Sequence, residues 1–264
     1  MPINGVRIIE EPNYSVFYID NFSDEFKQII RDQLKGIWSG FSKADSLPEY
    51  YSYQNTLKSF LGRYNSKSIE TKKGMIGELL SHILLNYQDN HLTSLSILKN
   101  KEEKSIKKGF DIIYCNIADK KLWYSEVKSG RSESGSVDST NYNQELLKRA
   151  KEGILKMINE KRESLWESAL IDVDLVIKEN EGRLDLAKLL SNDSPCLNSN
   201  QKKNVILISS LYHDLSDTIN KDSVSDFWDN TLSENIFEDV IIISIQKTTF
   251  ETVAIFLNDE ITNP

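Results

Sequence analysis

The sequence contains few of the residues that cross-link small proteins or bind zinc. Its 264 residues include only 2 cysteines and 3 histidines. Cys115 and Cys196 show no paired spacing and have no histidine close by. Structural zinc sites and disulfide frameworks both depend on such spacing, so we expect neither in this protein.

Long apolar runs are also missing. No run approaches the roughly 18 residues that a membrane span needs. The first residues, MPINGVRIIEEPNY, lack the apolar stretch that is typical of a secretory signal. We therefore expect a cytoplasmic protein that does not contact a membrane.

Several motifs of common enzymes are absent. The chain has no internal repeat, no P-loop G-x-x-x-x-G-K-[ST], no G-x-S-x-G and no H-E-x-x-H. Because the P-loop is the usual phosphate cradle of ATPases, we expect no ATP hydrolysis by this chain on its own.

Basic residues are in the minority, and a net charge of −8 at first opposes a nucleic-acid partner. The imbalance is local: residues 163–264 hold 7 Lys and Arg against 19 Asp and Glu, a net −12 that leaves +4 for residues 1–162. The acidic final third either faces a protein partner or serves solubility. The lysines and arginines near the centre of the chain either contact phosphate or form a solvated surface. They are Lys99, Lys101, Lys104, Lys107, Lys108, Lys120, Lys121, Lys128 and Arg131.

The apolar residues predict a mixed α/β fold. A hydrophobic content of 39% suffices for a packed core. Helical spacing predicts helices after an N-cap at Ser23 to about residue 37, and at 53–64, 70–87 and 144–163. Strands are predicted at 14–19, 93–98, 110–115, 121–129, 204–210, 239–246 and 250–257, and the apolar segment 169–177 is assigned to the sheet as well. We expect a mixed sheet flanked by helices, with residues 1–69 as a small N-terminal module of unknown role and residues 70–264 as the main domain.

The segment KGFDIIYCNIADKKLWYSEVKSG, residues 108–130, carries the clearest chemical pattern. It predicts two strands joined by a polar turn. Side chains alternate along a strand, so Glu126 and Lys128 share one face and lie about 6–7 Å apart. Asp111 interrupts the apolar run of the preceding strand. Two carboxylates on neighbouring strands with a lysine beside them could hold a divalent metal and activate water, which predicts a metal-dependent nuclease.

The predicted helix 70–87 holds one more candidate. Gly77 weakens a helix by about 1 kcal/mol relative to alanine, so its presence suggests close packing. Glu78 follows it, off the centre of the apolar face. Taken alone, Glu78 is typical of a solvated helix residue, and His82 of a structural or surface histidine.

Phosphodiester hydrolysis gives each candidate a role. Asp111 and Glu126 offer the hard oxygen ligands that Mg²⁺ or Mn²⁺ prefers, and the Val127 carbonyl is a further candidate ligand. Lys128 would position or deprotonate water and offset developing negative charge. The role of base requires a lowered pKa, which a nearby metal favours and the adjacent carboxylates oppose.

The order and spacing of these residues resemble the PD-(D/E)xK nuclease superfamily. Glu78 stands on a helix, Asp111 on one strand, and Glu126-x-Lys128 on the next. The resemblance implies a restriction-endonuclease-like αβββαβ core between about residues 70 and 210. It also implies that Glu78 completes the metal shell, directly or through water. Gly109 and Phe110 precede Asp111, where some members carry proline.

Two longer motifs resemble the HamA family, the nuclease subunits of the Hachiman anti-phage defence system. They are KKGMIGELLSHILL, which contains Gly77 and Glu78, and the run from GFD to EVKSG. This resemblance implies a helicase partner of the HamB type and a Mg²⁺-dependent deoxyribonuclease that degrades DNA after infection or DNA damage. Two alternatives stay open. One is an inactive nuclease-fold binding or scaffold subunit, and the other is a sequence-specific restriction endonuclease.

Overall fold

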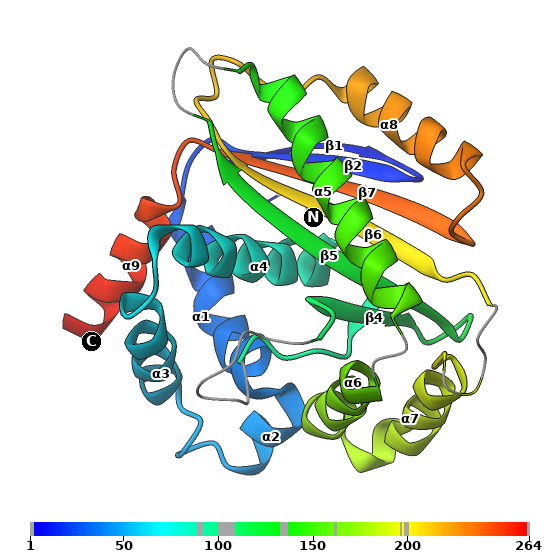
Figure 1. Cartoon of the computed structure of the whole chain (residues 1–264). Helices are drawn as coiled ribbons and strands as arrows, with labels where there is room; N and C mark the ends of the chain where they lie inside the picture. The colour runs from blue at the N-terminus through cyan, green and yellow to red at the C-terminus, as the bar shows by residue number, and fades with distance from the viewer. Residues whose placement is uncertain are drawn as a thin grey trace.

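The computed structural model of the chain describes residues 3–88, 92–99, 109–132, 137–160, 163–195, 197 and 201–262. These residues form one seven-stranded sheet between two layers of helices (Figure 1). The predicted α/β class, a mixed sheet flanked by helices, is confirmed.

The sheet combines parallel and antiparallel pairing in the order β1-β2-β7-β6-β5-β4-β3. Its strands are β1 (Val6–Glu11), β2 (Tyr14–Ile19), β3 (Leu92–Ser94), β4 (Ile112–Asn116), β5 (Lys121–Arg131), β6 (Asn204–Tyr212) and β7 (Asp239–Lys247). The four central strands, β2, β7, β6 and β5, are parallel, whereas β1 at one edge and the β4–β3 pair at the other are antiparallel to their neighbours. The central strands are almost wholly buried, as expected for parallel strands covered on both faces.

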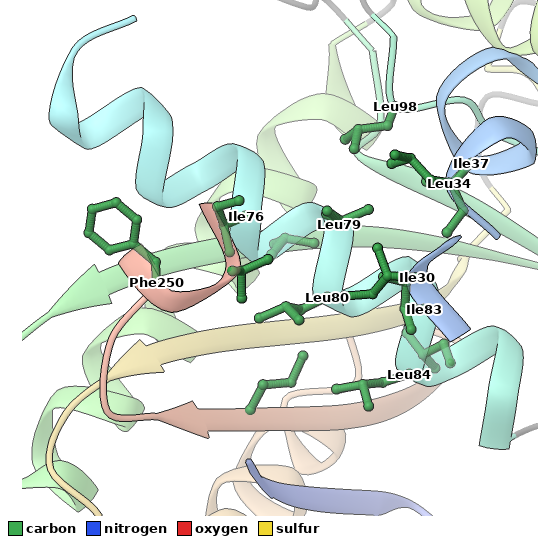
Figure 2. Packing of buried hydrophobic residues seen from close by; sticks show 14 of the residues in the cluster. Ile30, Leu34, Ile37, Ile76, Leu79, Leu80, Ile83, Leu84, Leu98 and Phe250 are labelled. Carbon is green, nitrogen blue, oxygen red and sulfur yellow. The ribbon is translucent and has the colours of Figure 1, made fainter. Parts of the chain in front are cut away.

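One helix layer covers one face of the sheet. Within it, the apolar face predicted for residues 70–87 belongs to a helix that packs on the sheet. The layer consists of α1 (Asp24–Ser39), α3 (Tyr53–Asn65), α4 (Ile69–Gln88) and α9 (Glu251–Thr262), with the short α2 (Phe41–Ser46) after α1. Figure 2 shows the buried face of α4 beside α1; the labelled α4 residues are Ile76, Leu79, Leu80, Ile83 and Leu84, and none of them is exposed to solvent. Each such side chain stabilises the fold by about 1.5–3 kcal/mol on burial.

The second layer covers the opposite face. It consists of α5 (Ser139–Asn159), α6 (Glu163–Val176), α7 (Arg183–Asn192), preceded by the 3-10 turn Glu179–Glu181, and α8 (Lys221–Ser233). The helix α5 begins at Ser139 and not at the predicted residue 144, because the Asp138 side chain accepts a hydrogen bond from Asn141 N at 2.8 Å and caps it. The predicted cap at Ser23 is confirmed, since its Oγ accepts from Phe26 N at 3.2 Å.

Two segments assigned to the sheet are helices. Residues 169–177 lie largely within α6, and residues 250–257 lie largely within α9. Their buried side chains recur at helical spacing, and they are Leu165, Trp166, Ala169, Val173 and Val176 in α6 and Val253, Ala254, Phe256 and Leu257 in α9. Each helix covers a face of the sheet, and its apolar side chains form a stripe that is buried against that face.

The segment 93–98 is only partly a strand. The ladder of β3 ends at Ser94, because the Ser96 hydroxyl takes the next hydrogen bond from Ile113 N at 2.9 Å. The chain then turns to α1, where Leu98 N donates to the Ile37 carbonyl at 2.7 Å. A strand that the sequence analysis did not predict, β1, pairs with β2 across a turn at Pro12 and Asn13.

The order α4-β3-β4-β5-α5-β6 reproduces the expected αβββαβ succession, with α6 and α7 added before β6. Of the two strands in residues 1–69, β2 pairs with β7 in the same sheet and β1 pairs with β2, and the division of the chain at residue 69 stays a prediction. Within the described ranges, none of the helices combines the length and the apolar character that a bilayer span requires. Cys115 is a buried free thiol, while Cys196 and the lysines at 101, 104, 107 and 108 lie outside the described residues.

Candidate active site at the open edge of β5

The β4–β5 hairpin opens where the candidate residues lie. The two strands pair from Asn116 opposite Lys121 to Ile112 opposite Ser125, and no pairing between them continues beyond this point. Asp111 precedes β4 here, and its Oδ2 accepts a hydrogen bond from Val127 N at 2.8 Å. The structure thus ties Asp111 directly to the strand that carries Glu126 and Lys128.

Val127 contributes its backbone to this edge. Its side chain packs in the core beneath α4, so only the peptide groups face the hairpin opening. The N–H and C=O of one strand residue point to the same side of the strand. Because Val127 N–H points to Asp111, its carbonyl oxygen faces the same side, as the predicted ligand role requires.

Glu126 lies buried beneath α5, with 6% of its surface exposed. Lys128 Nζ donates a hydrogen bond to Glu126 Oε1. Gly153 of α5 lies directly against this carboxylate: a Cβ at Gly153 would be 2.9 Å from Oε1 and 3.3 Å from Cδ. Glycine is therefore the residue that lets α5 close over Glu126.

The pKa values of Glu126 and Lys128 are both raised above their ordinary values. Burial raises the pKa of Glu126 to about 8, with further contributions from the negative charges of Asp111 and Glu78 and an opposing one from Lys128. Burial lowers the pKa of Lys128, but the carboxylates of Glu126 and Asp111 outweigh this effect and the pKa is raised. This balance favours the charged form of Lys128.

Glu78 approaches the site from the opposite face of β5. It is half-buried on α4 and follows Gly77, whose backbone touches β5: a Cβ at Gly77 would lie 2.0 Å from Ser129 Oγ and 3.1 Å from Ser210 Cβ. This contact accounts for the glycine that the sequence singled out. Glu78 reaches Glu126 through its charge, which adds to the raised pKa of Glu126.

The donor set fits a hard divalent cation. Asp111 and Glu126 provide two carboxylates on adjoining segments, and the Val127 carbonyl faces the same edge. Mg²⁺ is commonly bound through one or two carboxylates and keeps several waters. Among the described residues, no three His, Cys, Asp or Glu side chains are gathered closely enough to hold a metal ion by themselves. A cation here would therefore depend on the two carboxylates, the backbone oxygen and water, and the role of Glu78 as a ligand stays a prediction.

The site has two α5 residues to which the sequence analysis gave no role in the site. Arg149 is exposed on α5. It lies between Leu146, which packs on Gly130, and Gly153, which packs on Glu126, and its charge acts on Lys128. The sequence signal for Gly153 is its place inside a helical pattern, where a glycine indicates close backbone approach.

A comparison with protein families covers almost the whole chain. The family model HamA matches residues 3–258. The chain belongs to the HamA family. The match confirms the resemblance carried by the motifs around Gly77–Glu78 and Asp111–Lys128, and it links the protein to Hachiman anti-phage defence. No curated protein matches the chain.

HamA membership leaves the superfamily assignment open. The match covers the N-terminal strands β1 and β2 as well as the hairpin that carries the candidate site. The PD-(D/E)xK assignment stays a prediction, supported by the αβββαβ order and by the position of Asp111 beside Glu126 and Lys128.

Proposed function

We propose that this HamA protein is a Mg²⁺- or Mn²⁺-dependent DNA nuclease, the effector subunit of an anti-phage defence complex with a helicase partner of the HamB type. The observation that carries the proposal is the grouping of Asp111, Glu126 and Lys128 at the open edge of β5. Two hard oxygen donors and a cation at one edge supply what phosphodiester hydrolysis needs.

Lys128 acts as a cation in this arrangement. Burial lowers its pKa, but Glu126 and Asp111 raise it by more, and this balance favours the charged form over the neutral amine. It can donate hydrogen bonds to a phosphate oxygen and offset the negative charge that develops on the phosphate during attack. Of the two roles that the sequence left open, the raised pKa favours charge stabilisation.

The carboxylates hold and orient the reacting groups. Asp111 and Glu126, with the Val127 carbonyl, would hold the divalent cation, and Glu78 would complete its shell. When bound, the cation supplies positive charge to the phosphate and lowers the pKa of a coordinated water. The hydrogen bond from Val127 N to Asp111 Oδ2 fixes that carboxylate before substrate arrives, and α5 shields Glu126 from bulk solvent.

The proposed protein partner would meet the acidic side of the chain. Helix α8 exposes three acids at positions i, i+4 and i+7, which place them on one face: Asp222, Asp226 and Asp229, the α8 acid row. A row of this sign repels phosphate and suits a basic protein surface. The proposed complex would also restrain a nuclease that could otherwise damage the DNA of its own cell.

A nuclease-fold binding subunit without activity is the second candidate. It is favoured by one observation, that no cluster of three metal-binding side chains is formed within the described residues. Incubation of the purified chain with plasmid DNA, with and without the helicase partner and with Mg²⁺ or EDTA, separates the candidates. A metal-dependent smear supports the proposed nuclease, discrete fragments support a sequence-specific endonuclease, and intact plasmid under every condition supports the binding subunit.

A further inference from the structure

A cavity of about 340 Å³ lies between the end of α1, the helix α3 and the segment that follows β3. Its size is within the range of small-ligand pockets, roughly 300–1,000 Å³. Aromatic rings and small polar side chains line it, together with one lysine. The lining residues are Trp38, Ser39, Tyr50, Tyr51, Asn55, Thr56, Ser59 and Lys99.

The floor of the cavity contains a polar group that the protein leaves unpaired. Trp38 is almost fully buried, and its Nε1 donates to Ser59 Oγ at 3.1 Å. Thr56 is only 3% exposed, and its hydroxyl has no hydrogen-bond partner. Buried hydroxyls are nearly always paired, because an unpaired one loses its bond to water without compensation. A ligand with a polar edge would satisfy it.

The rim presents an aromatic ring on an ordered loop. Tyr50 is 72% exposed, and its ring meets that of Tyr51 edge-on with centroids 4.9 Å apart. Asn55 Nδ2 donates to the carbonyls of Glu49 and Tyr50 at 3.2 and 3.3 Å, which holds the loop against α3. The ring of Tyr50 is therefore held beside the cavity and open to a planar group.

Lys99 places a positive charge at the same rim. Its side chain is exposed, while its backbone N–H donates to the Trp38 carbonyl at 3.2 Å and fixes its position. An aromatic platform, a polar floor and a nearby cation together match a nucleobase with its phosphate.

The cavity is within reach of the candidate active site. Leu95 N donates to the Ile113 carbonyl at 2.7 Å, which anchors this segment beside β4. Lys99 is four residues after Leu95, and Asp111 is two residues before Ile113. At a maximum of about 3.6 Å per residue, and with about 5.5 Å between Leu95 and Ile113, the Cα atom of Lys99 lies within roughly 27 Å of that of Asp111. A single strand several nucleotides long can cover this separation.

We propose that this cavity binds one unpaired base of single-stranded DNA, stacked on Tyr50 and hydrogen-bonded to Thr56, with Lys99 beside the phosphate. The inference rests on the proposed nuclease function and adds to it a preference for DNA that has been unwound. A base paired in a duplex cannot enter the cavity, so the site selects single strands.

Fluorescence anisotropy of the full-length chain tests this with a labelled single-stranded oligonucleotide and with the duplex of the same sequence. EDTA is present, so the Kd does not depend on cleavage. Tyr50→Ala should raise the single-strand Kd between about fivefold and a hundredfold, whereas Tyr50→Phe, which keeps the ring, should leave it unchanged. Thr56→Val should raise it as well, because valine matches the shape of threonine without the hydroxyl.

Lys58, exposed on α3 and outside the cavity lining, is the charge-matched control. Lys99→Ala should raise the Kd more than Lys58→Ala. The inference is overturned if Tyr50→Ala binds single strands like the wild-type chain, if it weakens duplex binding equally, or if the wild-type chain binds no single strand. A chain that cuts no DNA but loses single-strand binding through Tyr50→Ala would refute the nuclease and keep the cavity assignment.

Discussion

Replacing Gly153 by alanine tests whether the Glu126 carboxylate is the reactive centre. The new Cβ would lie 2.9 Å from Glu126 Oε1, below the 3.4 Å at which ordinary contact begins. The atom that must move is the end of a side chain and not backbone. We therefore expect Gly153→Ala to displace the carboxylate by about half an ångström or more and to leave the fold intact.

The energetic effects on stability nearly cancel. Alanine stabilises a helix interior by about 0.5–1 kcal/mol relative to glycine. A displaced, off-rotamer glutamate costs about 0.5–1.5 kcal/mol. The free energy of unfolding should stay within about 1 kcal/mol of the wild-type value, a Tm shift of no more than about 4 °C. Cleavage should fall about 10- to 100-fold, because misplacing a catalytic group by about 1 Å costs that much.

Gly74→Ala is the matched control. Gly74 also lies inside a helix, and a Cβ there would meet nothing within 4 Å. It should gain the same helix propensity and keep full activity. The reasoning fails if Gly153→Ala cleaves DNA at the wild-type rate, or if thermal unfolding shows a loss of several kcal/mol.

Three further experiments test charged side chains in the site and on α8. The pKa of Glu126 is raised to about 8, chiefly by burial, so its stabilising effect is present below pH 4.5 and is lost as the pH rises through about 8. Relative to Glu126→Gln, the wild-type chain should lose unfolding free energy over this range, and identical denaturation profiles against pH would contradict this. Arg149→Ala should raise the KM for DNA severalfold at low salt, whereas Lys148→Ala, exposed one position away, should change it little, and equal effects would remove any special role for Arg149. Replacing the three aspartates of the α8 acid row by lysine should weaken co-purification with the helicase, and the remaining binding should depend less on salt. Undiminished binding would leave these acids a role in solubility only.

The hairpin and the site order were predictable because they depend on local pattern. Strand alternation placed Glu126 and Lys128 on one face, and both strands are present. The glycine at Gly77 correctly indicated close packing, here against Ser129. The same argument applies to Gly153, which shows that the signal was available at a second position.

The errors arise where tertiary packing decides between helix and strand. The apolar runs at 169–177 and 250–257 are short, and a short run fits either element. Both segments are helices, α6 and α9, that cover a face of the sheet, and this tertiary position cannot be read from the local sequence pattern. The strand β1 was missed because its burial is uneven, with outward-facing residues such as Arg7 and Glu10. The Pro12–Asn13 turn before β2 was the available sign of that hairpin.

The hydrogen bond between Glu126 and Lys128 and the position of Asp111 could not be predicted from local sequence pattern. Sequence put all three near one edge, but the bond from Val127 N to Asp111 depends on where β4 and β5 separate. The raised pKa of Lys128 likewise depends on the balance between burial and two carboxylates. These are properties of the folded site, and of the two roles expected for Lys128 they favour charge stabilisation over proton abstraction.

The most direct test of the site is the cleavage of plasmid DNA by single variants of the purified chain, assayed with its helicase partner in Mg²⁺. Asp111→Ala, Glu126→Ala and Lys128→Ala should each abolish cleavage while circular dichroism shows an unchanged fold, since none of the three side chains belongs to either hydrophobic cluster of the core. Glu145→Ala, exposed on α5, should cut like the wild-type chain. Cleavage at the wild-type rate by all three site variants, or by the wild-type chain in EDTA, would contradict the assignment of a metal-dependent nuclease centre to this edge of β5.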